Sequence, residues 1–380
     1  MHHNLLLSII IPTKNRYNCL LPVINSILKN VESTNFELII HDNSDDNISV
    51  INYFNNNSDK RLKYFYLNES ISIVDNTIKA IEKTSGKYIT FIGDDDFISP
   101  FICDIVSLLD QKDIDNLIYN TGYYWWENVV FAKPTNFCNK NILWLPNNIS
   151  TNLELLNSNF ELNKVLENGG THYGMLPRFY HGIVKKSKLV EIKQATGSYL
   201  PGACPDMAFA VSLSQVIKEY YWINYPVTIF GASSNSGAGW GARKVHFGKI
   251  EDMPFLPKGL INRWDPKIPL IWSGHTTNAQ AIFDVFTAFN INRNINYSNF
   301  YASMMVNEPM LRKYIYPLVL KLSKSNLIFH FPLQYINMYL KQSFMSIYLN
   351  LRYMIGKFKF EVIKINNVDE CMQELKKLKF

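Results

Sequence analysis

Three consecutive carboxylates follow a short apolar run and a single glycine. Asp94, Asp95 and Asp96 come after the segment 88–92. At neutral pH adjacent carboxylates repel one another, and a bound divalent cation relieves that repulsion. Mg2+ and Mn2+ are typically held by one or two carboxylates together with substrate phosphates, whose developing charge the metal neutralises. The triplet therefore predicts a divalent-metal site for a phosphorylated substrate. The alternative is a solvated acidic turn, or an N-terminal cap for the helix after Pro100.

The elements that must position the triplet alternate between strand and helix. Short apolar runs are typical of strands buried on both faces, and apolar residues at three- and four-residue spacing are typical of helices with one buried face. The sequence predicts strands over 5–11, 36–40, 64–67 and 88–92, and helices over 20–28 and 73–81. This alternation is the pattern of a doubly wound α/β sheet.

Polar segments directly follow three of the predicted strands. They cover residues 12–16, 41–46 and 93–96. Because ligands of doubly wound sheets bind beyond the carboxyl ends of the strands, we expect these segments to converge on one crevice.

The composition excludes several classes of protein. Residues 300–380 hold 12 Lys and Arg against 5 Asp and Glu, so the rest of this chain of net charge +6 is nearly neutral. No basic stripe surrounds the triplet, which argues against a nucleic-acid partner. The five cysteines lack C-x-x-C spacing, and no apolar run approaches the ~20 residues that span a bilayer. We expect a soluble, cytoplasmic protein without disulfides or structural zinc, with peripheral association at the inner face of the cell membrane as an open alternative.

Three motifs, in this order and at these spacings, resemble the nucleotide-sugar domain of family 2 glycosyltransferases. Ser-Ile-Ile-Ile-Pro-Thr-Lys-Asn-Arg at 8–16 resembles the family's first strand and turn. Residues 39–46 resemble its V-D-D-G-S-x-D segment, and residues 86–96 its G-x-Y-I-x-x-x-D-x-D-D segment. The resemblance covers residues 7–110 and implies a GT-A fold, which is α/β with a Rossmann-like, doubly wound mixed sheet.

The resemblance implies how the donor is bound. Pro12 and Thr13 would line the nucleotide pocket, with Asn15, Arg16 and Asn76 as further candidate contacts to the nucleotide-sugar. These side chains come from the first turn and from the predicted helix over 73–81.

The carboxylates take separate roles in the same resemblance. Asp42 would accept a hydrogen bond from the base, with N3–H of uracil as the expected donor. Asp94 would face the ribose or diphosphate, and Asp95 would be the primary ligand of Mn2+ or Mg2+. Asp94 and Asp96 are further candidate metal ligands.

Two positions depart from the family pattern. Gly93 occupies the place where many members have the first Asp of D-x-D-D, so the resemblance implies a shifted or smaller set of metal ligands. Asn43 replaces the usual Gly, which is tolerable because Asn adopts left-handed conformations more readily than most residues.

An inverting transfer needs a base that deprotonates the acceptor hydroxyl. The segment 202–210 resembles the P-D-x-x-x-A segment of bacterial polysaccharide members, in which the Asp has the position of the catalytic base. Asp206 is therefore the predicted base. The alternative is a cap or first-turn acid of the helix after Pro205, and the two roles are compatible.

Residues on the acceptor side are less specific. The segment 178–184 resembles a strand that precedes the base and borders the acceptor site, which makes His181 and His172 candidate acceptor contacts. A lone His is more often a structural residue, so that alternative stays open.

The Gly- and Ser-rich stretch 231–241 has two interpretations. It is either a lid that orders over the diphosphate or simply an exposed, flexible loop. Arg243 and His246 follow it and are a candidate phosphate contact and a candidate metal ligand.

The chain divides into a GT-A domain over 1–255, with halves of about 1–115 and 116–255, and a helical C-terminal region over 256–380. In that region Tyr, Phe and Leu alternate with Lys and Arg. A basic amphipathic surface on anionic lipid is one interpretation. Packing on the catalytic body, or oligomerisation, is the interpretation that we favour from the sequence.

The predicted activity is inverting, metal-dependent transfer of a hexose-type sugar from a nucleotide-sugar, with UDP as the expected nucleotide. The acceptor would be a hydroxyl of a bacterial surface glycan of capsule, O-antigen or teichoic type, or its lipid-linked precursor. Two alternatives remain open: a sugar-nucleotide nucleotidyltransferase, which would normally have a Gly-rich loop after the first strand, and a non-catalytic glycan-binding or scaffold protein.

Overall fold

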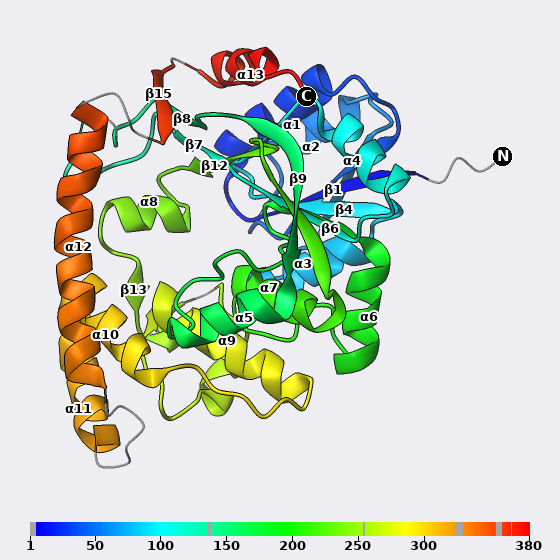
Figure 1. The fold of residues 1–380 in the computed structure, drawn as a ribbon. Helices are drawn as coiled ribbons and strands as arrows, with labels where there is room; N and C mark the ends of the chain where they lie inside the picture. Colours follow the sequence, from blue (N-terminus) through cyan, green and yellow to red (C-terminus); the bar gives the residue numbers. More distant parts are fainter. Residues whose placement is uncertain (1–4, 136–137, 254, 324–329, 355–358, 366) are drawn as a thin grey trace.

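The computed structural model describes residues 5–135, 138–253, 255–323, 330–354, 359–365 and 367–380, and Figure 1 shows their arrangement. Within them, the larger sheet has eight strands in the order β3-β2-β1-β4-β10-β6-β11-β9. These are β1 Leu7–Thr13, β2 Phe36–Asp42, β3 Leu62–Tyr66, β4 Tyr88–Phe91, β6 Asn116–Tyr119, β9 Ser150–Asn157, β10 Gly182–Lys185 and β11 Glu219–Asn224. β1 pairs in parallel with β2 and β4, whereas β10 is antiparallel to β4 and β6. The sheet is therefore mixed, as the resemblance implies.

A second sheet of the described chain has five strands in the order β15-β8-β7-β12-β5. These are β5 Phe97–Ile98, β7 Gly122–Trp125, β8 Ile142–Pro146, β12 Thr228–Ala232 and β15 Phe360–Lys364. β13 (Phe247–Gly248) and β14 (Trp272–Ser273) form a separate short pair. Because β5 follows β4 after a single turn, that turn joins the two sheets.

Helices cover both faces of the larger sheet. The α-helices of the described chain are α1 Tyr17–Asn30, α2 Ile51–Asn56, α3 Ile73–Glu82, α4 Ile102–Gln111, α5 Ser158–Glu167, α6 Lys186–Thr196, α7 Pro205–Val216, α8 Gly237–Ala242, α9 Gly274–Ala288, α10 Tyr297–Asn307, α11 Arg312–Ser323, α12 Phe331–Met354 and α13 Val368–Lys377. Alternate residues of β1 face opposite ways: Ile9 and Ile11 join the core under α1 and α4, and Ile10 joins the core formed with α3 and α7. The first four predicted strands and the two predicted helices are confirmed, with ends shifted by a few residues.

The chain after residue 255 is mostly helical, with additions that the sequence did not indicate. β15 returns to pair antiparallel with β8, and α13 packs beside α1 (Figure 1). The C-terminal segment is thus part of the second sheet and of the core below α1. The domain boundary at residue 255 stays a prediction. None of the described helices is long and apolar enough to cross a membrane.

Candidate active site

The carboxylate triplet lies in the turn between β4 and β5, at the carboxyl end of β4. Asp94 is 2% exposed, Asp95 3% and Asp96 0%. The turn closes with the N–H of Asp96 donating to the carbonyl of Gly93 at 3.3 Å. Burying a charge is costly unless the charge is paired and hydrogen-bonded, so the partners of each carboxylate decide what the triplet can do.

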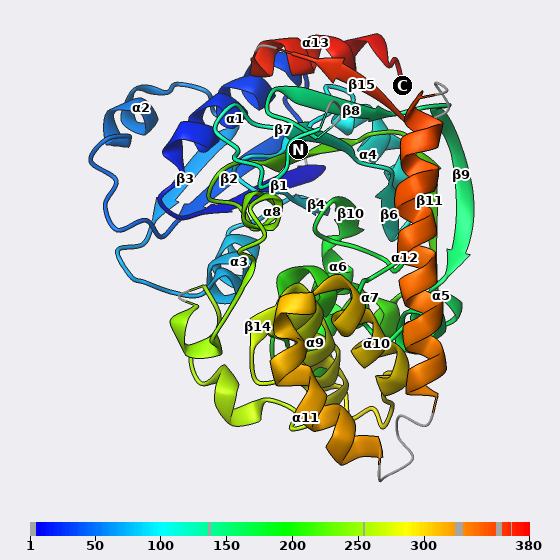
Figure 2. The same ribbon diagram turned by 90° about the vertical axis from the view of Figure 1, so that its left-hand side faces the viewer.

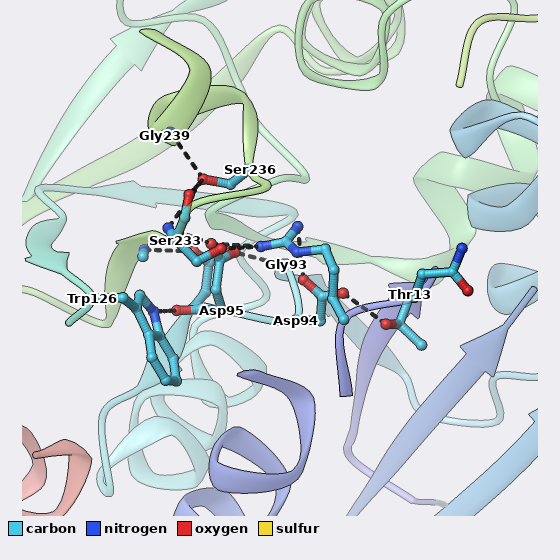
Figure 3. A network of polar contacts seen from close by, with 12 residues as sticks. Thr13, Gly93, Asp94, Asp95, Trp126, Ser233, Ser236 and Gly239 are labelled. Carbon is cyan, nitrogen blue, oxygen red and sulfur yellow. Dashed lines mark hydrogen bonds and ion pairs between the residues drawn. The ribbon is translucent and has the colours of Figure 1, made fainter. Parts of the chain in front are cut away.

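Arg16 pairs with the first two carboxylates. Its Nη1 lies 2.8 Å from Oδ1 of Asp94, and its Nη2 lies 2.6 Å from Oδ2 of Asp95. Oδ2 of Asp94 also accepts a hydrogen bond from the Thr13 hydroxyl at 2.6 Å (Figure 3). The neighbouring Pro12 is buried at the end of β1. The predicted convergence of residues 12–16 with 93–96 is confirmed by these contacts.

The segment 41–46 contacts the turn that carries Arg16. The N–H of Asn43 donates to the Thr13 carbonyl at 3.1 Å, and the N–H of Asn15 donates to the Ser44 hydroxyl at 2.7 Å. Asn15, with a φ of 57°, exchanges two hydrogen bonds with Asp45. A left-handed backbone is unusual for a residue with a side chain, and Asn tolerates it better than most. Asn15 is exposed and therefore remains open to a ligand.

Asn76, a predicted donor contact, fastens the ends of β1 and β2 together instead. Its Nδ2 donates to Oδ1 of Asn43 at 2.9 Å and to the carbonyl of His41 at 3.2 Å, and its Oδ1 lies 2.6 Å from Nδ1 of His41. Asn76 is 1% exposed. It therefore acts on the donor side only by holding the loops in place.

Asp42, the predicted base contact, is fully buried. Its Oδ2 accepts hydrogen bonds from the hydroxyls of Tyr17 and Tyr64, each at 2.7 Å, and its Oδ1 accepts one from the N–H of Ser44 at 2.8 Å. The side chain in this structure shapes the loop after β2. A contact to a base would need one of the two tyrosines to move.

Asp96 faces away from Arg16, in a direction that the sequence did not indicate. Its Oδ1 accepts from the N–H of Gly231 at 2.7 Å, and its Oδ2 accepts from the N–H of Gly93 at 2.6 Å and from the Tyr180 hydroxyl at 3.1 Å. Nε2 of His181 lies 3.1 Å from the same Oδ2. Asp96 is therefore a structural link between β4, β12 and the segment before β10.

The pKa shifts follow this division. Burial raises the pKa of Asp94 and of Asp95, and the charge of Arg16 offsets that rise only in part. Burial would also raise the pKa of Asp96, but the nearby His181 and the backbone N–H donors outweigh it, so the pKa of Asp96 is lowered. The charge of Asp96 is well compensated. Asp94 and Asp95 share one guanidinium and are left with a need for more positive charge.

Two glycines pack against the triplet, and one of them cannot be replaced. A Cβ at Gly231 would lie 1.7 Å from the carbonyl oxygen of Asp95, which no packing allows. A Cβ at Gly93 would lie 3.1 Å from Oδ2 of Asp96 and 3.3 Å from Oδ1 of Asp95. A side chain at position 93 would therefore require these carboxylates to shift by a few tenths of an ångström.

The stretch 231–241 lies on the triplet. The N–H of Ser233 donates to Oδ2 of Asp95 at 3.0 Å, and the Ser233 hydroxyl accepts from Arg16 at 2.8 Å. Of the two interpretations that the sequence left open, the exposed, flexible loop is wrong, because Ser236 caps α8 by accepting from the N–H of Gly239 (Figure 3). Arg243 follows α8 and donates to the Ser234 carbonyl at 3.1 Å.

Two further contacts to the turn were missed. Nε1 of Trp126 donates to the carbonyl of Asp95 at 2.8 Å, and no local signal around Trp126 marks it. Ser233 could have been suspected as a hydroxyl within the Gly- and Ser-rich stretch.

Asp206 lies in the first turn of α7, within electrostatic reach of Asp96 and His181. Burial raises the pKa of Asp206 to about 6, with the charge of His181 opposing that rise and Asp96 adding to it. Tyr180 interacts with both Asp96 and Asp206. The predicted base is therefore in the neighbourhood of the triplet, and it is also the first-turn acid of the alternative interpretation.

His181 is held between two polar groups. Its Nδ1 lies 2.6 Å from the Thr228 hydroxyl and its Nε2 faces Asp96, while the backbone has a φ of 50°. The residue is 2% exposed. In this structure the ring is closed to an acceptor. Its contacts make it a positioning residue for Asp96, and it acts on Asp206 only through its charge.

Residues 8–175 match the family model described as Glycosyl transferase family 2. This segment belongs to that family. It runs from β1 to beyond α5 and includes the Arg16 turn and the carboxylate triplet. The resemblance predicted from the motifs is confirmed, and the family together with the mixed α/β architecture supports the predicted GT-A fold. A glycosyltransferase is the class of enzyme that this segment indicates.

Individual relatives match at low coverage or low similarity. An uncharacterized glycosyltransferase of Rickettsia bellii (strain RML369-C) is 43% identical over 91 residues, which are 23% of this chain and 13% of that relative. Structures of S. aureus TarS 1–349 in complex with UDP and with UDP-GlcNAc are 14% identical, with TM-scores of 0.44 and 0.45. They cover 90% of this chain and 91% and 92% of those chains. The chain spans about an eighth of the curated relative, so that relative's name describes the family 2 segment alone.

His172 and His246 lie outside the network of the family 2 triplet. The His246 ring packs against Trp272, with centroids 4.5 Å apart. His172 is exposed, and its ring centroid is 5.7 Å from that of His275, which pairs with Glu308 at 3.0 Å. The structure thus groups these predicted ligands with the start of α9 and the end of α10.

Asp94 and Asp95 are the residues that could hold a divalent cation. They share the guanidinium of Arg16, and their raised pKa values indicate that their charges are under-compensated. The other predicted ligands, Asp96 and His246, face elsewhere. Among the described residues, no group of three or more His, Cys, Asp or Glu side chains is arranged to hold a metal. The site fits a cation as a pair of carboxylates completed by diphosphate oxygens, with Arg16 moved aside.

Proposed function

We propose that the whole chain is an inverting, metal-dependent glycosyltransferase that moves a sugar from a nucleotide-sugar to an acceptor hydroxyl. The observation that carries this proposal is the pair of buried carboxylates Asp94 and Asp95 under Arg16, at the carboxyl ends of β1 and β4 within the family 2 segment. A sheet of this kind binds its ligand at those strand ends. Two acids under one basic side chain suit a diphosphate and its counter-ion.

Arg16 and Ser233 would hold the leaving group. The guanidinium already contacts Asp94, Asp95 and the Ser233 hydroxyl, so a small movement would turn it toward a diphosphate. Bidentate contacts between Arg and phosphate are strong and well oriented. A divalent cation on Asp94 and Asp95, Mn2+ or Mg2+, would neutralise the negative charge of the departing diphosphate.

Asp206 would take the proton. As the acceptor oxygen forms its bond to the anomeric carbon, the bond from that carbon to the diphosphate breaks and the hydroxyl proton passes to the carboxylate. A pKa of about 6 leaves most of the Asp206 carboxylates charged at pH 7 while keeping them basic enough for general-base work. Attack from the face opposite the leaving group gives inversion.

The donor and acceptor are proposed only by class. UDP is the nucleotide to test first, because Asp42 matches the family's base-binding acid, although its two tyrosine partners must open for that contact. A bacterial surface glycan, or its lipid-linked precursor, is the proposed acceptor. This part of the proposal rests on the resemblance of the segment 202–210 to polysaccharide-building members.

The experiment is a nucleotide-release assay on the full chain with UDP-, GDP- and dTDP-sugars, in Mn2+, in Mg2+ and in EDTA. We expect release with one nucleotide class, loss in EDTA, and loss by at least about a hundredfold in Asp95→Asn and Asp206→Asn. Asp104→Asn is the control, because Asp104 is also a first-turn acid, in α4 rather than α7, but is exposed.

Three outcomes would reject the proposal in different ways. Release of pyrophosphate from a nucleoside triphosphate and a sugar phosphate would identify a nucleotidyltransferase. Undiminished activity in EDTA would show that the reaction needs no divalent metal. No turnover with any donor, together with unchanged glycan binding in both active-site variants, would identify a non-catalytic binding protein.

A further inference from the structure

Helix α12 carries an exposed apolar stripe along its length. Its members are Leu333, Ile336, Leu340, Phe344, Ile347 and Leu351, which are 58%, 53%, 46%, 68%, 58% and 50% exposed. They recur every three or four residues, so they lie on one face of the helix. A helix of 24 residues is about 36 Å long. A continuous apolar surface of this kind marks an interaction site.

The stripe faces away from the body of the molecule. Nε2 of Gln342 donates to Oδ1 of Asn307 at the end of α10, and Arg312 of α11 reaches the Tyr335 hydroxyl at 3.5 Å. Tyr335 and Gln342 are seven residues apart and therefore share the face that meets the body. Leu340 lies on the opposite face. Figures 1 and 2 both place α12 on the outside of the molecule, beside α10 and α11.

The charge of the surrounding region indicates what kind of surface the stripe can bind. The segment 309–360 contains eight Lys and Arg and no Asp or Glu. Lys341 directly follows Leu340 and is exposed, and Lys313 and Lys321 are exposed on α11. A second copy of the chain would bring like charges together across the stripe. An anionic surface with an apolar interior is complementary to both features.

Aromatic side chains border the stripe. Tyr339 and Tyr348 are 54% and 49% exposed, on either side of it. Tyrosine is enriched where a protein meets the boundary between headgroups and acyl chains, because one end of the ring is apolar and the other polar. Two further side chains of α11, Tyr316 and Leu320, are also exposed, at 56% and 51%.

We propose that α11 and α12 rest on an anionic lipid bilayer. The stripe of α12 lies at the boundary of the headgroups and acyl chains, parallel to the membrane plane, and Lys313, Lys321 and Lys341 contact lipid phosphates. This mode needs an amphipathic helix rather than a spanning one. The inference reverses the preference drawn from the sequence, which was packing or oligomerisation. It does not depend on the proposed sugar transfer.

The test is flotation of the full chain with extruded vesicles of phosphatidylcholine, alone or with about a quarter phosphatidylglycerol. We expect binding to the anionic vesicles to be at least about tenfold tighter than to neutral ones, and to weaken as salt shortens the Debye length. The variant Leu340→Ser/Phe344→Ser should lose at least about tenfold in partitioning, because it removes two inserting side chains.

The matched control is Leu155→Ser/Phe160→Ser, which changes the same two residue types at positions 54% and 59% exposed on β9 and α5. It should bind as the wild type does. Lys341→Glu removes no apolar surface and should weaken binding to anionic vesicles alone. Sedimentation velocity without lipid tests the alternative, in which a second copy of the chain covers the stripe.

Several results would overturn the proposal. Equal binding to neutral and anionic vesicles, no binding to either, or equal losses in the two double variants would each refute it. A wild-type dimer that becomes a monomer in Leu340→Ser/Phe344→Ser, with no vesicle binding, would identify the stripe as a face between copies of this chain.

Discussion

Replacing the proposed base with its neutral isostere, Asp206→Asn, probes the chemistry most directly. The side chain keeps its size and its place in the first turn of α7 but cannot accept the acceptor's proton. Removal of a general base typically lowers turnover by about 10²- to 10⁴-fold. We expect a loss in that range in kcat, with donor binding by calorimetry unchanged, because Arg16, Asp94 and Asp95 hold the donor.

The pH dependence of kcat/KM provides a second measure of the role of Asp206. Burial raises the pKa of Asp206 to about 6, and the reaction needs the charged form. The wild-type kcat/KM should therefore be flat above pH 7 and fall toward about a tenth at pH 5, where roughly one carboxylate in ten remains charged. The residual activity of Asp206→Asn should lack this acidic limb.

A variant of His181 provides a second, independent test of the pKa of Asp206. Its charge lowers the pKa of Asp206, so His181→Asn should move the acidic limb to higher pH. Asn is the chosen substitute because position 181 has a φ of 50°, which Asn tolerates. Asp104→Asn, the exposed first-turn acid of α4, should leave the profile unchanged.

Two results would refute the assignment. A limb that persists in Asp206→Asn belongs to another acid, and Asp94, whose pKa burial also raises, is the obvious one. A limb that moves to lower pH in His181→Asn would mean that His181 does not act on Asp206 through its charge.

Three further variants test the triplet, its neighbouring glycine and the sheet that carries them. Arg16→Gln leaves two buried carboxylates without their counter-ion, so it should lower the free energy of unfolding by about 3 kcal/mol; Mn2+ should raise its Tm more than that of the wild type, and an equal rise would show that the guanidinium and a cation do not share a position. Gly231→Ala places a Cβ 1.7 Å from the carbonyl of Asp95 and should cost about 3 kcal/mol and most of the activity, whereas Gly241→Ala, with no atom within 4 Å of its Cβ, should be tolerated in urea unfolding and in assay. Glu37 is 2% exposed and accepts hydrogen bonds from Ser and Lys side chains, which lower its pKa although burial opposes that shift. The stabilisation from Glu37 should be complete above its unfolded pKa and disappear as the pH falls through its folded pKa. Glu37→Gln should abolish that pH dependence and lower the free energy of unfolding in urea by about 2 kcal/mol.

Local pattern was enough to predict the N-terminal half of the sheet. Strands β1, β2 and β4 are mostly apolar and buried on both faces, and Ile9, Ile10 and Ile11 divide between the two cores as that pattern requires. Strand β3, at the edge of the sheet, is only half-buried. The meeting of residues 12–16, 41–46 and 93–96 followed from the shared edge of parallel strands. Neither inference needed a contact between distant segments to be known.

The features that could not be predicted from the sequence depend on contacts between distant segments. Strand β15 pairs with β8, which is more than two hundred residues away in the sequence. The residues of the segment 360–364 do not indicate that β8 is their partner. Helix α8 forms in a Gly- and Ser-rich stretch because Ser236 caps it and Gly239 allows close approach to the Ser233 carbonyl. Propensity alone favours a loop there.

The unequal roles of the three aspartates arise in the same way. Adjacent residues of one type look equivalent in a sequence, yet the charge of Asp96 is compensated by backbone N–H groups of Gly93 and Gly231 that cannot leave without unfolding the turn. Asp94 and Asp95 are compensated mainly by one side chain, Arg16, which can rotate. A partner fixed in the backbone makes a carboxylate structural, whereas a partner on a rotatable side chain makes it exchangeable. In the mechanism that we propose, only the exchangeable pair would accept a cation or release Arg16 to a diphosphate without loss of the fold.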